Sequence, residues 1–113
     1  MTGAGAEPVR RLALALPEAA EGDHHGAPAF TVAGKIFCTL NAEASRFTVK
    51  LVPEDQDNLV AGHVGAVEPV PGYWGRKGWT HVRYDQIDEA TMAMLLKLAW
   101  SNVAPKRLLK TGA

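Results

Sequence analysis

The sequence predicts a single α+β domain in which helices pack on one face of an antiparallel sheet. At 113 residues the chain has the length of one ordinary domain and is too short for two. Apolar side chains recur at helical spacing near both ends of the chain, whereas residues 29–51 alternate with a period of two between short turns. Helices that flank a run of consecutive strands are typical of the α+β class.

The first helix is expected over residues 8–16. Pro8 suits a first helical position, Pro17 is a natural stop, and four apolar residues between them are spaced to share one helix face. These residues are Val9, Leu12, Ala13 and Leu16. The next segment, 18–28, is rich in charge, glycine and proline and is therefore predicted to be a loop.

Three strands are expected to form an antiparallel meander over residues 29–32, 35–40 and 46–51, because these segments are rich in Phe, Val, Ile and Thr. Alternation places one set of side chains from each of the last two strands on the core side of the sheet. These sets are Ile36, Cys38 and Leu40, and Phe47, Val49 and Leu51.

A fourth strand, over residues 79–84, alternates so evenly that the pattern leaves open which face is the inner one. One face carries Trp79, His81 and Arg83, and the other carries Thr80, Val82 and Tyr84. A short helix over 53–61 is expected before this strand, because Pro53 suits its start and Gly62 its end.

The last helix is predicted over residues 89–103, where apolar residues repeat at helical spacing. Asp88 is a good N-cap, and Ile87 and Met92 are spaced as a hydrophobic staple. The predicted order of elements is α-β-β-β-α-β-α within one domain spanning residues 1–113. The ends, residues 1–7 and 109–113, are expected to be frayed.

The charge balance restricts the expected partners. The chain has 12 Lys and Arg residues and 12 Asp and Glu residues, so its net charge is zero. Neutrality argues against the non-specific attraction that drives much binding to nucleic acids. Residues 69–113, however, hold seven basic and three acidic side chains, a net of +4, which leaves −4 on residues 1–68. A neutral total is therefore compatible with one basic face.

The cysteine content and hydropathy indicate the expected compartment. A single cysteine, Cys38, excludes an intramolecular disulfide, and its place within a strand predicts a small buried hydrophobe rather than a catalytic thiol. The sequence has neither a signal peptide nor a run of about 18 apolar residues. We therefore expect a cytoplasmic protein without a membrane partner.

The expected working surface is the segment 69–79. It combines three aromatic residues, two adjacent cations, three glycines and two prolines. Aromatic faces beside cations can stack on bases, hold a planar ligand or anchor a protein partner. The competing interpretation is structural: Trp74 and Trp79 would close one end of the core, and Arg76 and Lys77 would be solvated turn residues.

Further cations would extend this surface if the fold brought them to the same face. Lys35 lies at the tip of an expected hairpin, and Lys106, Arg107 and Lys110 follow the last helix. Cations at the end of a helix are also commonly explained by the helix dipole alone.

No catalytic or metal motif is present, so neither an enzyme nor a cofactor is expected. An acidic and histidine-rich segment is the one candidate for metal binding, but its spacing matches no known ligand motif. It consists of Glu21, Asp23, His24 and His25, with His63 or His81 as a distant third ligand.

Several of these segments together resemble the MmcQ/YjbR family over roughly residues 10–110. The likeness is carried by Leu14-Ala15-Leu16-Pro17-Glu18, Glu21-Gly22, the run from Gly26 to Phe37, Lys50-Leu51, Trp79, Ser101 and Lys106-Arg107-Leu108. The resemblance implies a small bacterial protein with a frataxin-like (CyaY-like) α+β fold, and DNA binding by analogy to a double-winged arrangement. The family has no agreed enzymatic motif that could be transferred to positions of this sequence, and the resemblance therefore implies no particular functional site.

The leading hypothesis is a non-enzymatic, monomeric domain that contacts DNA phosphates through its aromatic and basic residues. These residues are Lys35, Trp74, Arg76, Lys77, Lys106 and Arg107. The alternative is a protein-interaction or small-ligand-binding module that uses the surface of Tyr73, Trp74 and Trp79.

Overall fold

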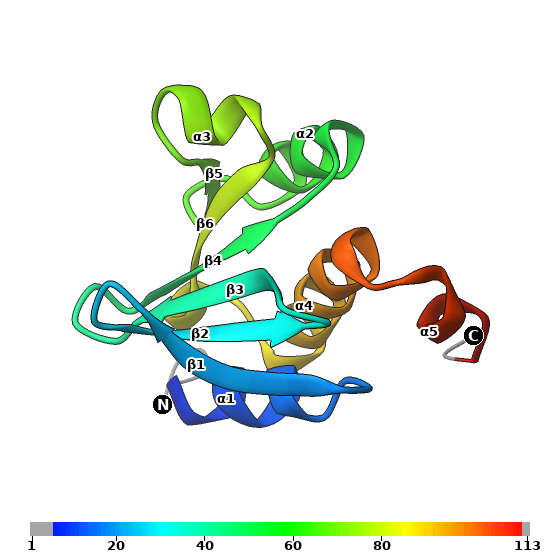
Figure 1. Ribbon diagram of the computed structural model, residues 1–113. Coiled ribbons are helices and arrows are strands. Elements are labelled where there is room, and N and C mark those ends of the chain that lie inside the picture. The colour runs from blue at the N-terminus through cyan, green and yellow to red at the C-terminus, as the bar shows by residue number, and fades with distance from the viewer. Residues whose placement is uncertain (1–5, 112–113) are drawn as a thin grey trace.

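The computed structural model describes residues 6–111 (Figure 1). The helices are α1 (Ala6–Leu14), α2 (Pro53–Gly62), α3 (Tyr73–Arg76), α4 (Glu89–Val103) and α5 (Lys106–Thr111), with a 3₁₀ turn at Tyr84–Gln86. The strands are β1 (Ala19–His24), β2 (Ala27–Val32), β3 (Lys35–Asn41), β4 (Arg46–Lys50), β5 (Val67–Pro69) and β6 (Trp79–Arg83). No described helix is both long and apolar enough to cross a membrane.

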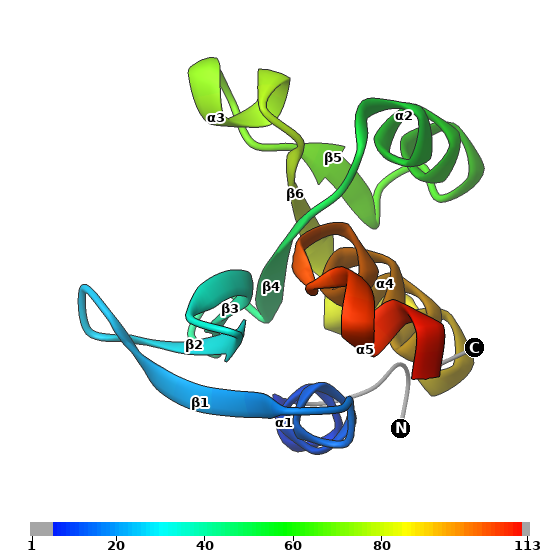
Figure 2. The ribbon, with the colours of Figure 1, turned by 45° about the vertical axis from the view of Figure 1, so that its right-hand side comes forward.

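The described strands form one six-stranded antiparallel sheet in the order β1-β2-β3-β4-β6-β5. Helices α1 and α4 pack against each other and against the same face of the sheet. Figure 2 shows these two helices on one side of β1 to β4, while α3 rises beside β5 and β6 on the other side. The α+β class is therefore confirmed, and one broad face of the sheet lies outside the helical layer.

The core lies between this sheet and helices α1 and α4. Its largest fully buried side chains include Trp100 and Leu95 of α4 and three phenylalanines from the central strands: Phe30, Phe37 and Phe47. The Trp100 indole donates a hydrogen bond to the Pro17 carbonyl at 3.0 Å, which satisfies the only polar atom of that ring. Cys38 is buried in the same layer, as expected.

A bulge in β3 corrects the expected alternation of that strand. The register shifts between Phe30, which lies opposite Cys38, and Thr31, which lies opposite Ile36. Phe37 is the extra residue and joins Cys38 in the core, whereas Ile36 is partly exposed on the opposite face. The prediction that Ile36 shares the core side with Cys38 and Leu40 is therefore wrong. An interpretation based on strict alternation assumes that the period of two is unbroken, so it cannot show where a bulge adds a residue to the strand.

Residues 18–28, predicted to be a loop, contain the edge strand β1. It pairs with β2 throughout and turns at His25 and Gly26, whose φ angles are +52° and +85°. The Asp23 carboxylate accepts a hydrogen bond from the Gly26 amide at 3.1 Å. β1 was missed because five of its six residues are exposed, so it has no apolar alternation.

The three predicted helices match their expected segments closely. α4 spans the predicted residues, and the Asp88 carboxylate accepts a hydrogen bond from the Thr91 amide at 2.8 Å, as an N-cap should. α2 extends one residue beyond the prediction, and α1 lies two residues earlier than predicted. α1 ends at Leu14 because the residue before a proline is disfavoured in helical geometry, here Leu16 before Pro17.

Three short elements were also not predicted. These are β5 and the single-turn helix α3, within and near the expected loop, and the C-terminal helix α5. Of the ends expected to fray, residues 1–5 and 112–113 lie outside the described part of the chain. Within it, α1 already includes Glu7, and α5 continues to Thr111.

Candidate ligand-binding cavity

A cavity of about 380 Å³ lies on the face of the sheet that α1 and α4 leave uncovered. Its apolar walls are Ile36, Val70, Trp74 and Trp79. Its polar lining is His24, Thr39, Thr48 and His81. The size and the mainly apolar lining with a few polar groups are typical of sites for small molecules.

The two faces of β6 are now assigned. Thr80, Val82 and Tyr84 are buried, whereas Trp79 and His81 are partly exposed and line the cavity. β6 therefore contributes one side to the core and the other to the cavity, which explains why neither face was conspicuously polar in the sequence.

The aromatic residues of the 69–79 segment are not part of the core. Trp74 is 59% exposed and Tyr73 is 55% exposed, and their rings meet edge to face with centroids 5.2 Å apart. Trp79 is partly exposed at the start of β6. The structural interpretation, in which Trp74 and Trp79 close one end of the core, is therefore contradicted by their exposure. Both rings instead line the cavity.

Glycines allow the backbone of this segment to close tightly. A Cβ atom on Gly75 would lie 1.9 Å from the Val70 carbonyl oxygen, so the single turn of α3 can pack on Val70 only with glycine there. A Cβ atom on Gly78, whose φ is +103°, would lie 2.0 Å from the Leu51 carbonyl oxygen. The close approach at Gly75 therefore seats α3 on Val70, and the one at Gly78 holds the residues after α3 against Leu51, which follows β4.

Gln56 of α2 holds the segment 69–79 in place through polar contacts of its side chain. Its buried Nε2 lies within hydrogen-bond distance of the carbonyl oxygens of Gly75, at 3.0 Å, and Trp79, at 3.2 Å. It also lies 3.0 Å from the Thr80 hydroxyl oxygen, which in turn donates to the Gly78 carbonyl at 3.0 Å. Gln56 is therefore a positioning residue for the aromatic segment. This role could not be predicted from the sequence, because a glutamine on a polar helix has no distinguishing pattern.

The polar floor of the cavity is a row of side chains that crosses three strands. Thr39 pairs with Thr48 between β3 and β4, and Thr48 pairs with His81 between β4 and β6. Thr48 Oγ1 and His81 Nδ1 are 2.9 Å apart and share a hydrogen bond. Burial lowers the pKa of His81, and the positive charge of Arg46 lowers it further, while Glu68 opposes both. The row therefore presents a neutral imidazole and two hydroxyls at neutral pH.

Substitution of His81 by glutamine should reduce the loss of stability on mild acidification. The pKa of His81 in the folded protein lies below its value of 6.5 in the unfolded chain. The unfolded state therefore takes up the proton more readily, and the free energy of unfolding falls as the pH drops below about 6.5. Urea titrations at pH 7.5 and pH 5.5 should show a smaller drop for His81→Gln than for the parent protein. An equal drop in both proteins would contradict this role of His81.

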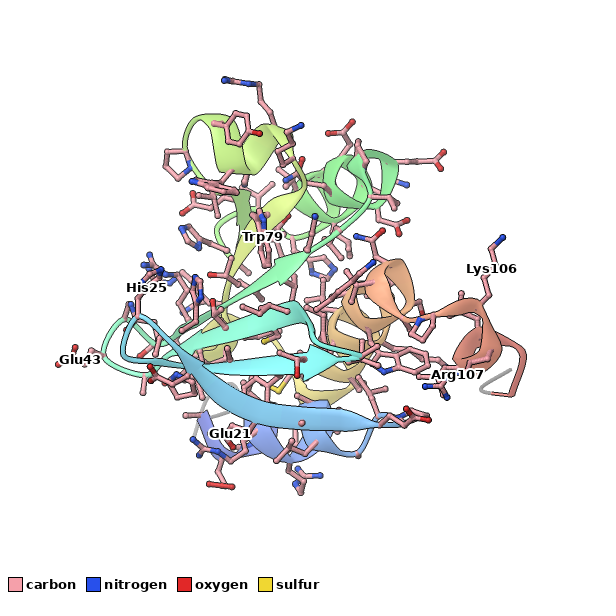
Figure 3. All side chains as sticks on the ribbon, viewed as in Figure 1. Glu21, His25, Glu43, Trp79, Lys106 and Arg107 are labelled. Atoms are coloured by element: carbon pink, nitrogen blue, oxygen red, sulfur yellow. The ribbon has the colours of Figure 1, made fainter. Side chains whose placement is uncertain are left out.

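The cations that were predicted to extend the binding surface lie in separate parts of the structure. Arg76 and Lys77 are exposed on and just after α3, where the Lys77 ammonium lies 5.3 Å from the centroid of the Tyr73 ring. Lys35 lies at the β2–β3 turn, beside the end of α4. In Figures 1 and 2, α5 is distant from α3, and Figure 3 shows Lys106 and Arg107 on α5, away from Trp79.

Arg107 is engaged in an ion pair. Its guanidinium donates two hydrogen bonds to the Glu18 carboxylate, at 2.7 and 2.8 Å. The Arg107 charge lowers the pKa of Glu18, chiefly through these hydrogen bonds, and Glu18 raises the pKa of Arg107. A phosphate would have to compete with Glu18 for this arginine, whereas Lys106 is exposed beside it.

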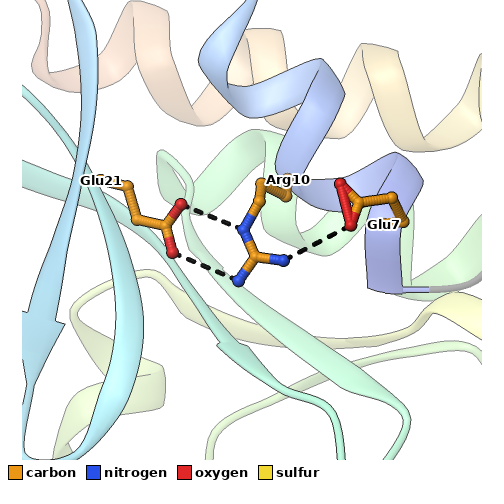
Figure 4. Close-up of polar contacts among 3 residues, drawn as sticks. All are labelled: Glu7, Arg10 and Glu21. Atoms are coloured by element: carbon orange, nitrogen blue, oxygen red, sulfur yellow. Dashed lines mark hydrogen bonds and ion pairs between the residues drawn. The ribbon is translucent and has the colours of Figure 1, made fainter.

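The acidic and histidine-rich segment is occupied by contacts within the protein. Arg10 of α1 donates to both carboxylate oxygens of Glu21, at 3.0 and 3.2 Å, and lies 3.6 Å from Glu7 (Figure 4). His24 and His25 stack edge to face, with ring centroids 4.3 Å apart. Within residues 6–111, no three His, Cys, Asp or Glu side chains are grouped as a metal site would need.

Burial raises the pKa of the Cys38 thiol, which keeps it in the unreactive protonated form.

The fold and the cavity define a small α+β domain with a ligand-sized hollow on one face of its sheet. The model of the YjbR family matches residues 14–102, and the chain therefore belongs to the YjbR family, as the sequence resemblance implied. No curated protein sequence matches the chain.

The fold is similar to that of a solved structure. Protein DR2400 of Deinococcus radiodurans, described as having the domain DUF419, is similar with a TM-score of 0.76 and 18% sequence identity. The alignment covers 88% of this chain and 78% of that chain. At this identity the likeness shows a shared α+β fold and carries no statement about a ligand.

Proposed function

We propose that this protein is a non-enzymatic binding domain that takes a small molecule with a flat apolar ring in the cavity between α3 and the sheet. The exposure of Trp74 is the observation that carries the proposal. A tryptophan that is 59% exposed leaves much of its apolar surface in water, and α3 holds it over a cavity that Trp79 also lines. A bound ring would cover this surface, and stacking on one aromatic side chain contributes about 1–3 kcal/mol.

The segment that carries Trp74 is held in place before any ligand arrives. Gly75 and Gly78 pack against backbone carbonyls, and the Gln56 amide lies within hydrogen-bond distance of the carbonyl oxygens of Gly75 and Trp79. A preorganised wall loses little conformational entropy on binding. The polar row of Thr39, Thr48 and His81 offers hydroxyl and imidazole groups to orient the ring.

Titration with N-phenyl-1-naphthylamine, a neutral probe that fluoresces in apolar surroundings, tests this proposal. We expect saturable binding to the parent protein, and binding about tenfold weaker in Trp74→Ala, equivalent to about 1.4 kcal/mol. Thr39→Phe, which places a larger side chain in the cavity, should also weaken binding. Met94→Ala, which removes an exposed apolar side chain of α4, is the matched control and should bind as the parent does.

The proposal fails if the parent protein shows no saturable binding of the probe. It also fails if Trp74→Ala and Thr39→Phe bind the probe as well as Met94→Ala does. Circular dichroism of each variant would show that the fold is retained.

A nucleic acid is the second candidate ligand, and the cations of α3 favour it. Arg76 and Lys77 are exposed next to Trp74, so a base on the aromatic surface could have its phosphate near these charges. Fluorescence anisotropy of duplex and single-stranded DNA at about 50 and 200 mM salt tests this candidate. We expect salt-weakened binding that is lost in the double variant Arg76→Ala, Lys77→Ala. Undiminished binding by that variant would contradict these phosphate contacts.

A further inference from the structure

A second hollow adjoins the cavity and shares Trp79 and Ile36 with it. Its volume is about 690 Å³, and it lies between the β2–β3 turn and the end of α4. Lys35, Lys50 and Asn102 supply polar groups to its lining. A molecule that filled the cavity could therefore extend past the edge of Trp79 into a polar and cationic neighbourhood.

Lys35 and Lys50 are held by rigid elements. Lys50 pairs with Trp79 across the β4–β6 ladder, and the Asn102 amide donates to the Lys50 carbonyl at 3.2 Å. The Lys50 ammonium lies 5.9 Å from the centroid of the Trp79 ring. Lys35 begins β3 directly after the turn at Gly34.

Neither lysine has its charge neutralised within the described part of the chain. The ion pairs there involve Arg10, Arg11, Arg83 and Arg107, and neither Lys35 nor Lys50 is among them. Two uncompensated ammonium groups beside one hollow attract an anionic group.

We propose that the ligand of the cavity is an aromatic anion, whose ring lies between Trp74 and Trp79 and whose phosphate, sulfonate or carboxylate lies between Lys35 and Lys50. This inference rests on the proposed function, because it assigns the ring to the same cavity. It adds the charge of the ligand and the two residues that recognise it. Aromatic carboxylates, aryl sulfonates and aryl phosphates belong to this chemical class.

Two probes that differ by a single anionic group test the inference. 8-Anilino-1-naphthalenesulfonate has the ring system of N-phenyl-1-naphthylamine with a sulfonate added. We expect the sulfonate probe to bind about five- to tenfold more tightly at low salt, and this preference to shrink as salt is added. Lys35→Met with Lys50→Met should abolish the preference and leave binding of the neutral probe unchanged, because methionine keeps most of the apolar stem.

The control is the double variant Lys97→Met, Lys106→Met, which removes the same charge from two exposed lysines elsewhere. It should retain the preference for the sulfonate probe. If it loses the preference as well, the effect belongs to net charge and the inference is overturned. If Lys35→Met, Lys50→Met does not fold, Lys35→Met alone should lose part of the preference.

The outcomes separate this inference from the proposed function. If neither probe binds, the cavity is not a ligand site and both fail. If both probes bind equally well, or if the Lys35 and Lys50 variant keeps the preference, the proposed function stands and the anionic site is refuted.

Discussion

Substitution of Gly78 by alanine should lower the free energy of unfolding by about 2–4 kcal/mol. Two costs combine at this position. The φ of +103° is one that residues with a Cβ rarely adopt, and that Cβ would lie 2.0 Å from the Leu51 carbonyl oxygen. The backbone there has little freedom to move apart, because the Leu51 amide donates to the Gly78 carbonyl at 2.9 Å. Chemical denaturation with urea would measure the change.

Gly34→Ala is the matched control for Gly78→Ala. Gly34 also has a positive φ, +79°, but a Cβ atom there meets nothing within 4 Å. It should therefore cost only the backbone term of about 1–2 kcal/mol. Equal losses for the two variants would mean that the contact with Leu51 relaxes freely, and that Gly78 is required for its conformation alone.

The elements predicted well from sequence are those whose buried side chains recur at a regular spacing along the chain. α4 combines an apolar repeat with an Asp88 cap, and β4 alternates Phe47 and Val49 with half-exposed residues. β1 carries no such period, since it is an edge strand with exposed residues on both faces. The bulge at Phe37 was also beyond prediction, because it depends on which residues of two strands come to face each other.

For a related reason, the sequence could indicate a candidate segment but not the cavity beside it. The aromatic and basic composition of residues 69–79 predicts a working surface, and Tyr73 and Trp74 are both more than half exposed there. The binding role of this segment stays a prediction. The cavity beneath it depends on long-range pairing of β3, β4 and β6, which brings Thr48 next to His81 and Lys50 next to Trp79. Single-sequence patterns report local periodicity and cannot assign such neighbours.

The division of the cations changes which binding hypothesis the geometry favours. The DNA hypothesis assigned the contacts to Trp74 and to five cations, and a shared face would have favoured it. The five cations are Lys35, Arg76, Lys77, Lys106 and Arg107. Arg107 is paired with Glu18, and α5 lies apart from α3 in both views of the ribbon. The ring cavity and the two lysines beside Trp79 form a more compact site than these scattered charges do. The geometry therefore favours a small aromatic anion, which would need only this one site, over a long polyanion, which would have to reach cations in separate places.

Substitution of Gln56 by glutamate should be among the most damaging single changes in the chain. It is isosteric, but at neutral pH it would direct a buried carboxylate at two carbonyl oxygens and the Thr80 hydroxyl oxygen, which now surround the Gln56 amide at 3.0–3.2 Å. A buried charge without a partner costs about 3–5 kcal/mol. Because these oxygens favour the protonated acid, the pKa of the new side chain would be raised, and part of the lost stability should return as the pH falls.

Two variants distinguish this charge effect from the loss of hydrogen bonds. Gln56→Leu removes the donor without adding charge and should cost about 1–3 kcal/mol with no recovery at low pH, because the Gly75 and Trp79 carbonyls keep their bonds to the Gly78 and Val70 amides. Gln86→Glu adds the same charge at an exposed position and should leave stability nearly unchanged. Urea titrations at pH 7.5 and 5.5 would measure all three variants. If Gln56→Glu behaved like Gln86→Glu, α3 would not depend on Gln56, and the rigid wall that supports Trp74 would need another source.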